Sequence, residues 1–118
     1  MIYLLWNCQG LGSDLTVRAL GRLIYKHRPP AVFLMKTKMR SNSIDGVRRR
    51  MGFDNCFNMD PVGVAGGLSL WWDNSVEIEV LFSTPNLIDS TIKILESGMV
   101  VRGSWVYGTP YREHKVEF

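Results

Sequence analysis

The order of the apolar runs is the feature that most constrains how this 118-residue chain can fold. Short apolar runs at residues 2–6 and 31–35 are typical of strands buried on both faces, and residues 53–59 form a further strand candidate. Residues 15–28 and 44–51 are predicted to be helices, because prolines follow the first and a glycine follows the second. The first half therefore predicts the order β-α-β-α-β, with parallel strands joined by helical crossovers.

The first helix is predicted to have two distinct faces. Val17, Leu20 and Ile24 fall at i, i+3 and i+7 and form an apolar stripe. Ser13 and Asp14 offer side-chain oxygens that can accept hydrogen bonds from the free amides of the first turn. A second face carries basic residues at i, i+4 and i+8: Arg18, Arg22 and Lys26.

From residue 68 onward the pattern changes to consecutive strands, at 68–72, 87–94 and 99–107. Between the first two, Val76, Ile78 and Val80 alternate with glutamates, which is the period of a half-solvated strand. This half predicts an antiparallel meander joined by hairpins. Residues 1–118 are thus expected to form one α/β (α+β) domain, with a mixed sheet and helices on at least one face.

Composition narrows the class of protein. Hydrophobic residues make up 46% and charged residues 21%, which is globular rather than disordered. The net charge of +3 permits an anionic partner such as nucleic acid without requiring one. No apolar stretch approaches the length of a membrane span, and residues 2–6 are too short for a signal sequence. Cys8 and Cys56 are expected to be free thiols, so the protein is expected in the cytoplasm or the nucleus.

Four segments together carry a resemblance. Residues 5–12 are LWNCQGLG, residues 33–38 are FLMKTK, residues 66–72 are GGLSLWW, and residues 105–110 are WVYGTP with Arg112 following. Singly, each has an ordinary explanation as a turn, a loop or core aromatics. In this order they resemble the endonuclease domain of plant non-LTR (LINE-type) retrotransposons, a branch of the endonuclease/exonuclease/phosphatase superfamily, over essentially the whole chain.

The resemblance implies a fold and partners. It implies about half, the N-terminal half, of the four-layer α/β/β/α sandwich of the DNase I-like fold. The fragment is expected to supply most of one sheet, and the face of that sheet which meets the second sheet is expected to be uncovered. An apolar face of that size marks an interaction surface or an aggregation risk, with poor solubility as the alternative to association. We therefore expect self-association or a complementing C-terminal half, with DNA as a further partner and no membrane.

The resemblance also implies a chemistry, hydrolysis of a phosphodiester by an activated water with Mg²⁺. Carried over by motif, Asn7 supports the metal and phosphate network and Tyr107 hydrogen-bonds at the scissile phosphate. Lys36 stands where the family has its glutamate metal ligand. Arg112 is placed as a neighbour of the phosphate, with a solvated surface arginine as the alternative.

Lys36 departs from the family pattern in the sign of its charge. An ammonium only donates hydrogen bonds and cannot coordinate a cation while protonated. At roughly 4 Å it repels a divalent ion by several kcal/mol at an effective dielectric near 20. The sequence thus predicts loss of Mg²⁺ affinity, with Lys36 as an internal cation or a phosphate ligand instead.

The family's remaining motifs, an Asp-Asn pair and a terminal Asp-His pair, have no counterpart up to Phe118, and neither His27 nor His114 matches them. Three hypotheses follow. The chain is a catalytically inactive remnant of a retrotransposon endonuclease, a nucleic-acid-binding module, or an α/β domain without either activity. In the second hypothesis, nucleic acid contacts the basic face of the first helix and the basic run at residues 48–50. The alternative interpretation of both basic segments is that they are solvated helix faces.

Overall fold

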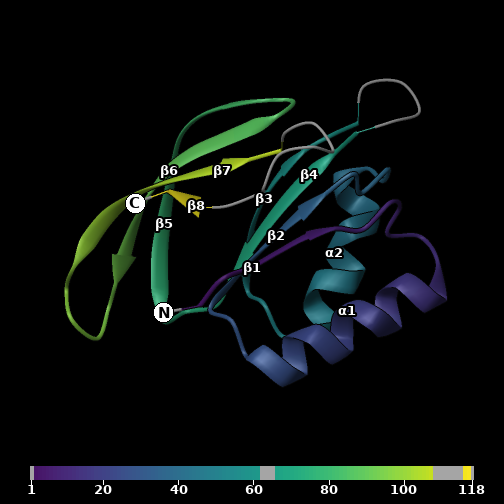
Figure 1. The fold of residues 1–118 in the computed structure, drawn as a ribbon, viewed down its shortest axis with the longest axis horizontal. Helices are drawn as coiled ribbons and strands as arrows, with labels where there is room; N and C mark the ends of the chain where they lie inside the picture. The colour runs from purple at the N-terminus through teal and green to yellow at the C-terminus, as the bar shows by residue number, and fades with distance from the viewer. Residues whose placement is uncertain (1, 62–65, 108–115, 118) are drawn as a thin grey trace.

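The computed structural model describes residues 2–61, 66–107 and 116–117. Figure 1 shows three layers, with two helices on one side, a four-stranded sheet in the middle and a second four-stranded sheet on the other side. The expectation of a single mixed sheet is therefore corrected, because the meander forms a sheet of its own. The α/β class with helices covering one face of a mixed sheet is confirmed.

The middle layer is the mixed sheet, with strand order β1-β2-β4-β3. Its strands are β1 (Leu4–Asn7), β2 (Ala31–Met35), β3 (Asn55–Met59) and β4 (Leu68–Trp72). β1 and β2 pair in parallel, as predicted for strands joined by a helical crossover. β4 lies between β2 and β3 and runs antiparallel to both, so β2 and β3 are not direct neighbours.

Both helices cover the same face of this sheet. α1 (Asp14–His27) starts where the Ser13 side chain accepts a hydrogen bond from the amide of Thr16 at 3.4 Å, as its N-cap position predicts. α2 (Ser41–Arg50) starts three residues earlier than predicted. The predicted apolar stripe of α1 packs inward, with Leu20 fully buried. The buried core beneath the helices contains Cys8, Leu11, Leu20, Val32, Leu34, Ile44, Val47, Phe53 and Trp71.

The second sheet has the strand order β5-β6-β7-β8, antiparallel throughout. Its strands are β5 (Val76–Thr84), β6 (Leu87–Ile94), β7 (Val100–Val106) and β8 (Val116–Glu117). The predicted meander is confirmed in β5 to β7, whereas β4, predicted to be its first strand, pairs with β2 and β3 in the other sheet. A register shift between Val80 and Phe82 bends β5.

The two sheets enclose a second core, which corrects the expectation of an uncovered inner face. Trp105 on β7 is fully buried against Phe33 of β2, with ring centroids 6.0 Å apart, and against Tyr3 at 5.3 Å. The Trp105 indole N–H donates to the Ser90 hydroxyl at 2.9 Å, so its polar atom is also satisfied. The second sheet thus supplies the cover that the sequence reasoning assigned to residues beyond this chain, because period-two alternation does not say what a strand packs against.

Both cysteines are free thiols, as expected, with Cys8 buried and Cys56 half-buried. Burial raises the pKa of each thiol, which favours the protonated form. Among the described residues, no helix has the length and apolar character needed to cross a membrane.

Candidate functional site

Four strand ends meet at one edge of the middle sheet. β1 and β2 end there, and β4 begins there because it runs antiparallel to β2. The backbone ties the adjoining loops together, with the amide of Gly10 donating to the Lys36 carbonyl at 2.8 Å and the amide of Thr37 donating to the Gly67 carbonyl at 3.2 Å. This edge therefore collects three of the four segments that carry the family resemblance.

Left-handed backbone is concentrated at this edge. Gln9, Lys36 and Lys38 have φ values of 51°, 52° and 54°, and Gly66 and Gly67 have φ values of 88° and 95°. Non-glycine residues rarely adopt this conformation, since the Cβ approaches the following carbonyl oxygen. Strained residues of this kind persist only where surrounding contacts hold them, and they cluster at functional sites.

A small pocket of about 80 Å³ opens at the same edge and brings Lys36 and Tyr107 together. Tyr107 directly follows β7, and its amide donates to the Asn86 carbonyl at 2.8 Å, which extends the pairing of β6 and β7 at this end of the second sheet. Lys36 is half-buried and makes no ion pair with any described carboxylate. The lining comprises Lys36, Asp60, Gly66, Gly67, Leu68, Pro85, Asn86 and Tyr107.

Asp60 is a pocket residue that the sequence reasoning missed. It directly follows β3, which ends at the same edge as β2 because both run antiparallel to β4. The hydroxyl and amide of Ser41 donate to one carboxylate oxygen at 2.7 and 3.0 Å, and they hold the pKa of Asp60 below its ordinary range. Arg40 lies 3.8 Å from the other oxygen. The sequence signal that could have identified Asp60 is a polar residue immediately after a predicted strand.

Asn7 does not line this pocket. It is the last residue of β1, paired in register with Met35, the residue before Lys36. Its side-chain oxygen is buried and has no hydrogen-bond partner among the described residues, and the same holds for the Thr37 hydroxyl. Buried polar atoms usually find partners, so two orphaned oxygens at one edge are an unusual concentration.

The residues present do not fit a Mg²⁺ centre. Mg²⁺ requires hard oxygen ligands in octahedral geometry, usually one or two carboxylates. Of the described residues, no three His, Cys, Asp or Glu side chains gather where they could hold a metal. The pocket offers the one carboxylate of Asp60, already engaged by Ser41, beside the ammonium of Lys36. The donor set thus disagrees with the cofactor that the family resemblance implies.

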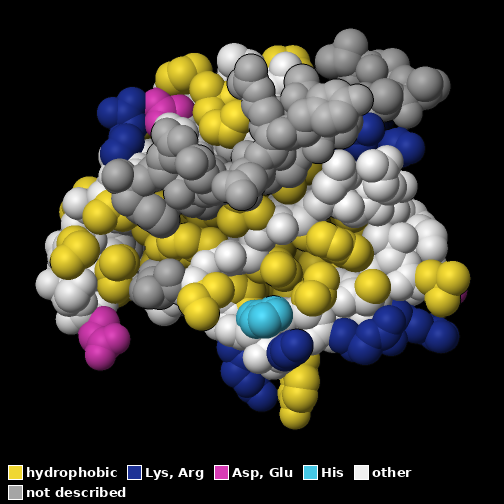
Figure 2. Space-filling view, viewed as in Figure 1, with side chains coloured by type: hydrophobic (Ala, Val, Ile, Leu, Met, Phe, Trp, Pro, Cys, Tyr) yellow, Lys and Arg dark blue, Asp and Glu magenta, His cyan; other side chains and the backbone are white. Residues whose placement is uncertain are grey.

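The predicted basic face of α1 is fully solvent-facing. Arg18, Arg22 and Lys26 are exposed, and none forms an ion pair with a described carboxylate. Figure 2 shows Lys and Arg side chains gathered along the lower right of the molecule, where Figure 1 places α1. Arg112 lies outside the described residues.

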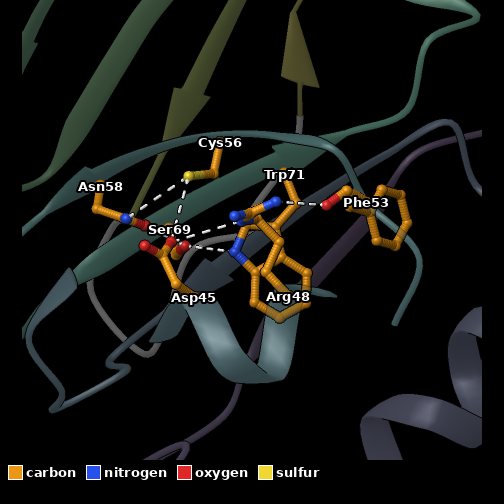
Figure 3. Close-up of polar contacts among 7 residues, drawn as sticks. All are labelled: Asp45, Arg48, Phe53, Cys56, Asn58, Ser69 and Trp71. Atoms are coloured by element: carbon orange, nitrogen blue, oxygen red, sulfur yellow. Dashed lines mark hydrogen bonds and ion pairs between the residues drawn. The ribbon is translucent and has the colours of Figure 1, made fainter. Parts of the chain in front are cut away.

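The second predicted basic run, residues 48–50, is only partly available to a partner. Arg48 is buried and donates to the Phe53 carbonyl at 2.6 Å, while its Nε lies 3.5 Å from an Asp45 carboxylate oxygen. Figure 3 shows this arginine pointing into a polar network between α2 and the sheet. Arg48 is therefore removed from the candidate nucleic-acid contacts, whereas Arg49 and Arg50 remain exposed.

The same network fixes α2 on β3 and β4. The Cys56 thiol donates to Asp45 at 3.8 Å, and the Asn58 amide donates to the Cys56 sulfur at 3.8 Å. The Ser69 hydroxyl donates to Asn58, and the Trp71 indole N–H donates to Ser69 at 2.6 Å. This chain of contacts is drawn in Figure 3. It holds the helix over the sheet face and away from the strand-end pocket, so its role is structural.

Two helices over two packed sheets form the arrangement of the DNase I-like fold, which this chain shares with solved nuclease and phosphatase structures. Among solved structures, the chain superposes on the 3′ phosphatase NExo from Neisseria bound to a product DNA hairpin. That match has a TM-score of 0.59 and 17% identity, and it covers 89% of this chain and 40% of that chain.

Two further structures superpose similarly. The human Nocturnin catalytic domain with bound sulfate matches with a TM-score of 0.61 at 14% identity, over 83% of this chain and 45% of that one. The AP endonuclease LMAP from Leishmania major matches with a TM-score of 0.59 at 13% identity, over 89% and 39%. This chain thus spans less than half the length of these three structures. No protein-family model and no curated protein sequence matches it.

Proposed function

We propose that this chain is part of a retrotransposon-derived, Mg²⁺-dependent type of DNA endonuclease domain in which the metal position has become cationic, so that it no longer hydrolyses phosphodiesters. The observation that carries the proposal is the pocket that Lys36 and Tyr107 line together in a DNase I-like fold. The four ordered sequence segments support the retrotransposon branch, since fold alone does not distinguish branches of a superfamily.

The charge of Lys36 supports the loss of catalysis. A protonated ammonium at the carboxyl end of β2 offers no lone pair to a metal and raises the local potential against any cation. The only described carboxylate in the pocket, Asp60, is hydrogen-bonded to Ser41 and cannot hold a divalent ion by itself. The proposed consequence is a pocket that favours anions over Mg²⁺.

A supercoiled-plasmid nicking assay tests the loss of catalysis. We expect no conversion to the open-circular form with Mg²⁺ beyond that in an EDTA control. Nicking that depends on Mg²⁺ would show that the site is assembled in another way and that the argument from Lys36 is wrong.

Isothermal titration calorimetry of Lys36→Glu tests the charge argument directly. The variant places a second carboxylate beside Asp60 in the pocket, so we expect measurable Mn²⁺ and Mg²⁺ binding that the unmodified chain lacks. Lys38→Glu is the matched control, because it makes the same charge change two residues away on an exposed side chain outside the pocket lining. Tight stoichiometric Mg²⁺ binding by the unmodified chain contradicts the proposal.

A second candidate function, nucleic-acid binding, is favoured by the exposed basic face of α1. Arg18, Arg22 and Lys26 are solvated without carboxylate partners among the described residues, which leaves their charge available to phosphates. A gel shift at increasing salt tests it, with Lys93→Ala on the second sheet as control. Binding that persists unchanged when all three residues are replaced by alanine excludes this face.

We also propose a complementing segment or a second copy as a partner. The second sheet keeps apolar side chains exposed on its strands, with Leu81, Phe82 and Val100 at 45%, 52% and 59% exposure. Large apolar side chains that remain exposed at both ends of a sheet favour association. Multi-angle light scattering at high concentration is expected to show self-association, and a clean monomer at every concentration argues against the second copy.

A further inference from the structure

A groove of about 390 Å³ lies between the carboxyl ends of the two helices. Its lining includes Pro29, which precedes β2, and Asp73, which follows β4. These positions are at the opposite ends of the strands from Lys36, so the groove and the Lys36 pocket lie at opposite edges of the middle sheet. The groove and the Lys36 pocket share no lining residue.

Two guanidinium groups face the groove without a carboxylate partner. Arg28 and Arg50 line it, and neither forms an ion pair with any described acidic residue. The one carboxylate in the lining, Asp73, accepts hydrogen bonds from the amide and the hydroxyl of Ser75. Asp73 keeps its negative charge but pairs with neither arginine among the described ion pairs, so two guanidinium groups face one carboxylate and the lining is positive on balance.

An exposed aromatic side chain lies beside these charges. Tyr25 is 74% exposed, an unusual position for a large ring, and the Arg28 guanidinium carbon lies 4.9 Å from the ring centroid. The floor is apolar and is built from Ile24, Met51 and Phe53. An exposed tyrosine ring over an apolar floor can stack on the flat base of a nucleotide, and Arg28 and Arg50, which have no carboxylate partner among the described residues, can bind its phosphates.

We infer that this groove binds a single-stranded nucleic-acid segment, with a base stacked on Tyr25 and the flanking phosphates held by Arg28 and Arg50. A single strand is required because a paired and stacked base does not offer its face to a side chain. Arg18 and Arg22 continue the positive charge along α1 from the groove. The inference extends the second candidate function to a defined site, and it holds whether or not the proposed loss of catalysis is correct.

The backbone at Arg28 provides a variant that separates binding from folding. Arg28 caps α1 in the left-handed conformation, with φ 44° and ψ 53°, and its amide donates to the Ile24 carbonyl at 2.7 Å. Glycine adopts this conformation without strain and is the usual residue at such a helix end. Arg28→Gly is therefore expected to keep or raise the melting temperature while removing the guanidinium.

The test is fluorescence anisotropy of the full chain with labelled oligo-dT and oligo-U of eight nucleotides, in 50 to 200 mM salt. Tyr25→Ala is expected to weaken binding about 5- to 150-fold, the loss of one base–aromatic stack. Arg28→Gly and Arg50→Ala are each expected to weaken it and to reduce the slope of log affinity against log salt by about 0.7.

Two controls match these variants. Arg49→Ala removes the same charge from the neighbouring exposed position of α2 outside the groove, and Tyr25→Phe keeps the ring. Both are expected to stay within about 2-fold of the unmodified affinity, since neither removes the stack or a proposed phosphate contact. Comparison of oligo-dT with oligo-U identifies which nucleic acid is preferred.

The inference is overturned by any of four results: no binding at 50 mM salt, equal affinity for a duplex, an unchanged affinity in Tyr25→Ala, or an equal loss in Arg49→Ala and Arg50→Ala. Loss of binding in the α1 variants at positions 18, 22 and 26, with normal binding in the groove variants, leaves the second candidate function standing and removes the groove.

Discussion

Two adjacent glycines at the strand-end edge allow the geometry of the candidate site to be tested by substitution. Gly66 and Gly67 share a left-handed backbone, with φ values of 88° and 95°. A Cβ added at Gly66 meets no atom within 4 Å, whereas one added at Gly67 collides with the Thr37 hydroxyl and lies 3.1 Å from the Pro61 ring. Gly66→Ala and Gly67→Ala therefore carry the same backbone strain, but only the second carries a steric clash.

The expected losses of stability follow from the backbone strain and the steric clash. A non-glycine residue in a sparsely populated backbone region costs about 1–3 kcal/mol, and this cost applies to both variants. Overpacking a filled site costs about a further 1–3 kcal/mol. Thr37 is fully buried, so its hydroxyl has little room to move away from a new methyl group. We expect Gly66→Ala to lower the free energy of unfolding by about 1–3 kcal/mol and Gly67→Ala by about 2–6 kcal/mol.

Urea denaturation followed by tryptophan fluorescence measures both values. Thr37→Ala removes the colliding hydroxyl, so a double-mutant cycle with Gly67→Ala is expected to recover part of the difference. The reasoning is refuted if the two alanine variants agree within about 0.5 kcal/mol, the limit of additivity for independent sites, or if the cycle shows no coupling.

Two further predictions concern the second sheet. Trp105→Ala is expected to cost about 3–5 kcal/mol in urea denaturation, because the ring is fully buried between the sheets, while the exposed Val106→Ala should change stability by less than about 0.5 kcal/mol. A small cost at Trp105 would mean that the sheets do not pack as described. The Arg102 guanidinium lowers the pKa of Asp89 in the folded protein. The ionised Asp89 carboxylate therefore stabilises the fold fully above its ordinary pKa near 3.8, and this stabilisation is lost as pH falls through the lower pKa of the folded state. The stability difference from Asp89→Asn should be constant from pH 5 to 7 and shrink below about pH 4, and a difference that grows in acid contradicts the assignment.

Local patterns predicted the individual elements closely. Strands β2, β4 and β6 have the predicted bounds, because each is a run bordered by clear turn or breaker residues. α1 differs by one residue at each end, since the Ser13 cap and the following prolines mark it well. The alternation in β5 correctly indicated which side chains turn inward, but it carried no information about the layer they meet.

Tertiary contacts decided what local patterns could not. Arg48 belongs to a basic run that is typical of a solvated helix face, yet one turn of α2 points it at the Phe53 carbonyl and into the interior. Asp60 joins the pocket only because β4 inserts between β2 and β3 and brings the end of β3 to the same edge. Neither strand order nor the rotation of a short helix is encoded within a few neighbouring residues, so both contacts required the folded arrangement.

Backbone hydrogen bonds hold together the strand-end edge around Lys36, so the fold of this edge does not depend on the side chain at position 36. Amides of Cys8, Gly10 and Thr37 bind carbonyls across the strand ends, and the Lys36 side chain takes part in none of these bonds. Exchange of its side chain therefore changes the charge of the pocket without removing a contact that supports the sheet. The free energy of unfolding of Lys36→Glu is expected to lie within about 0.5 kcal/mol of that of the unmodified chain, while the proposed preference of the pocket for anions over cations reverses. A large loss of stability in this variant would instead assign Lys36 a structural role and leave the proposed loss of metal binding without its physical cause.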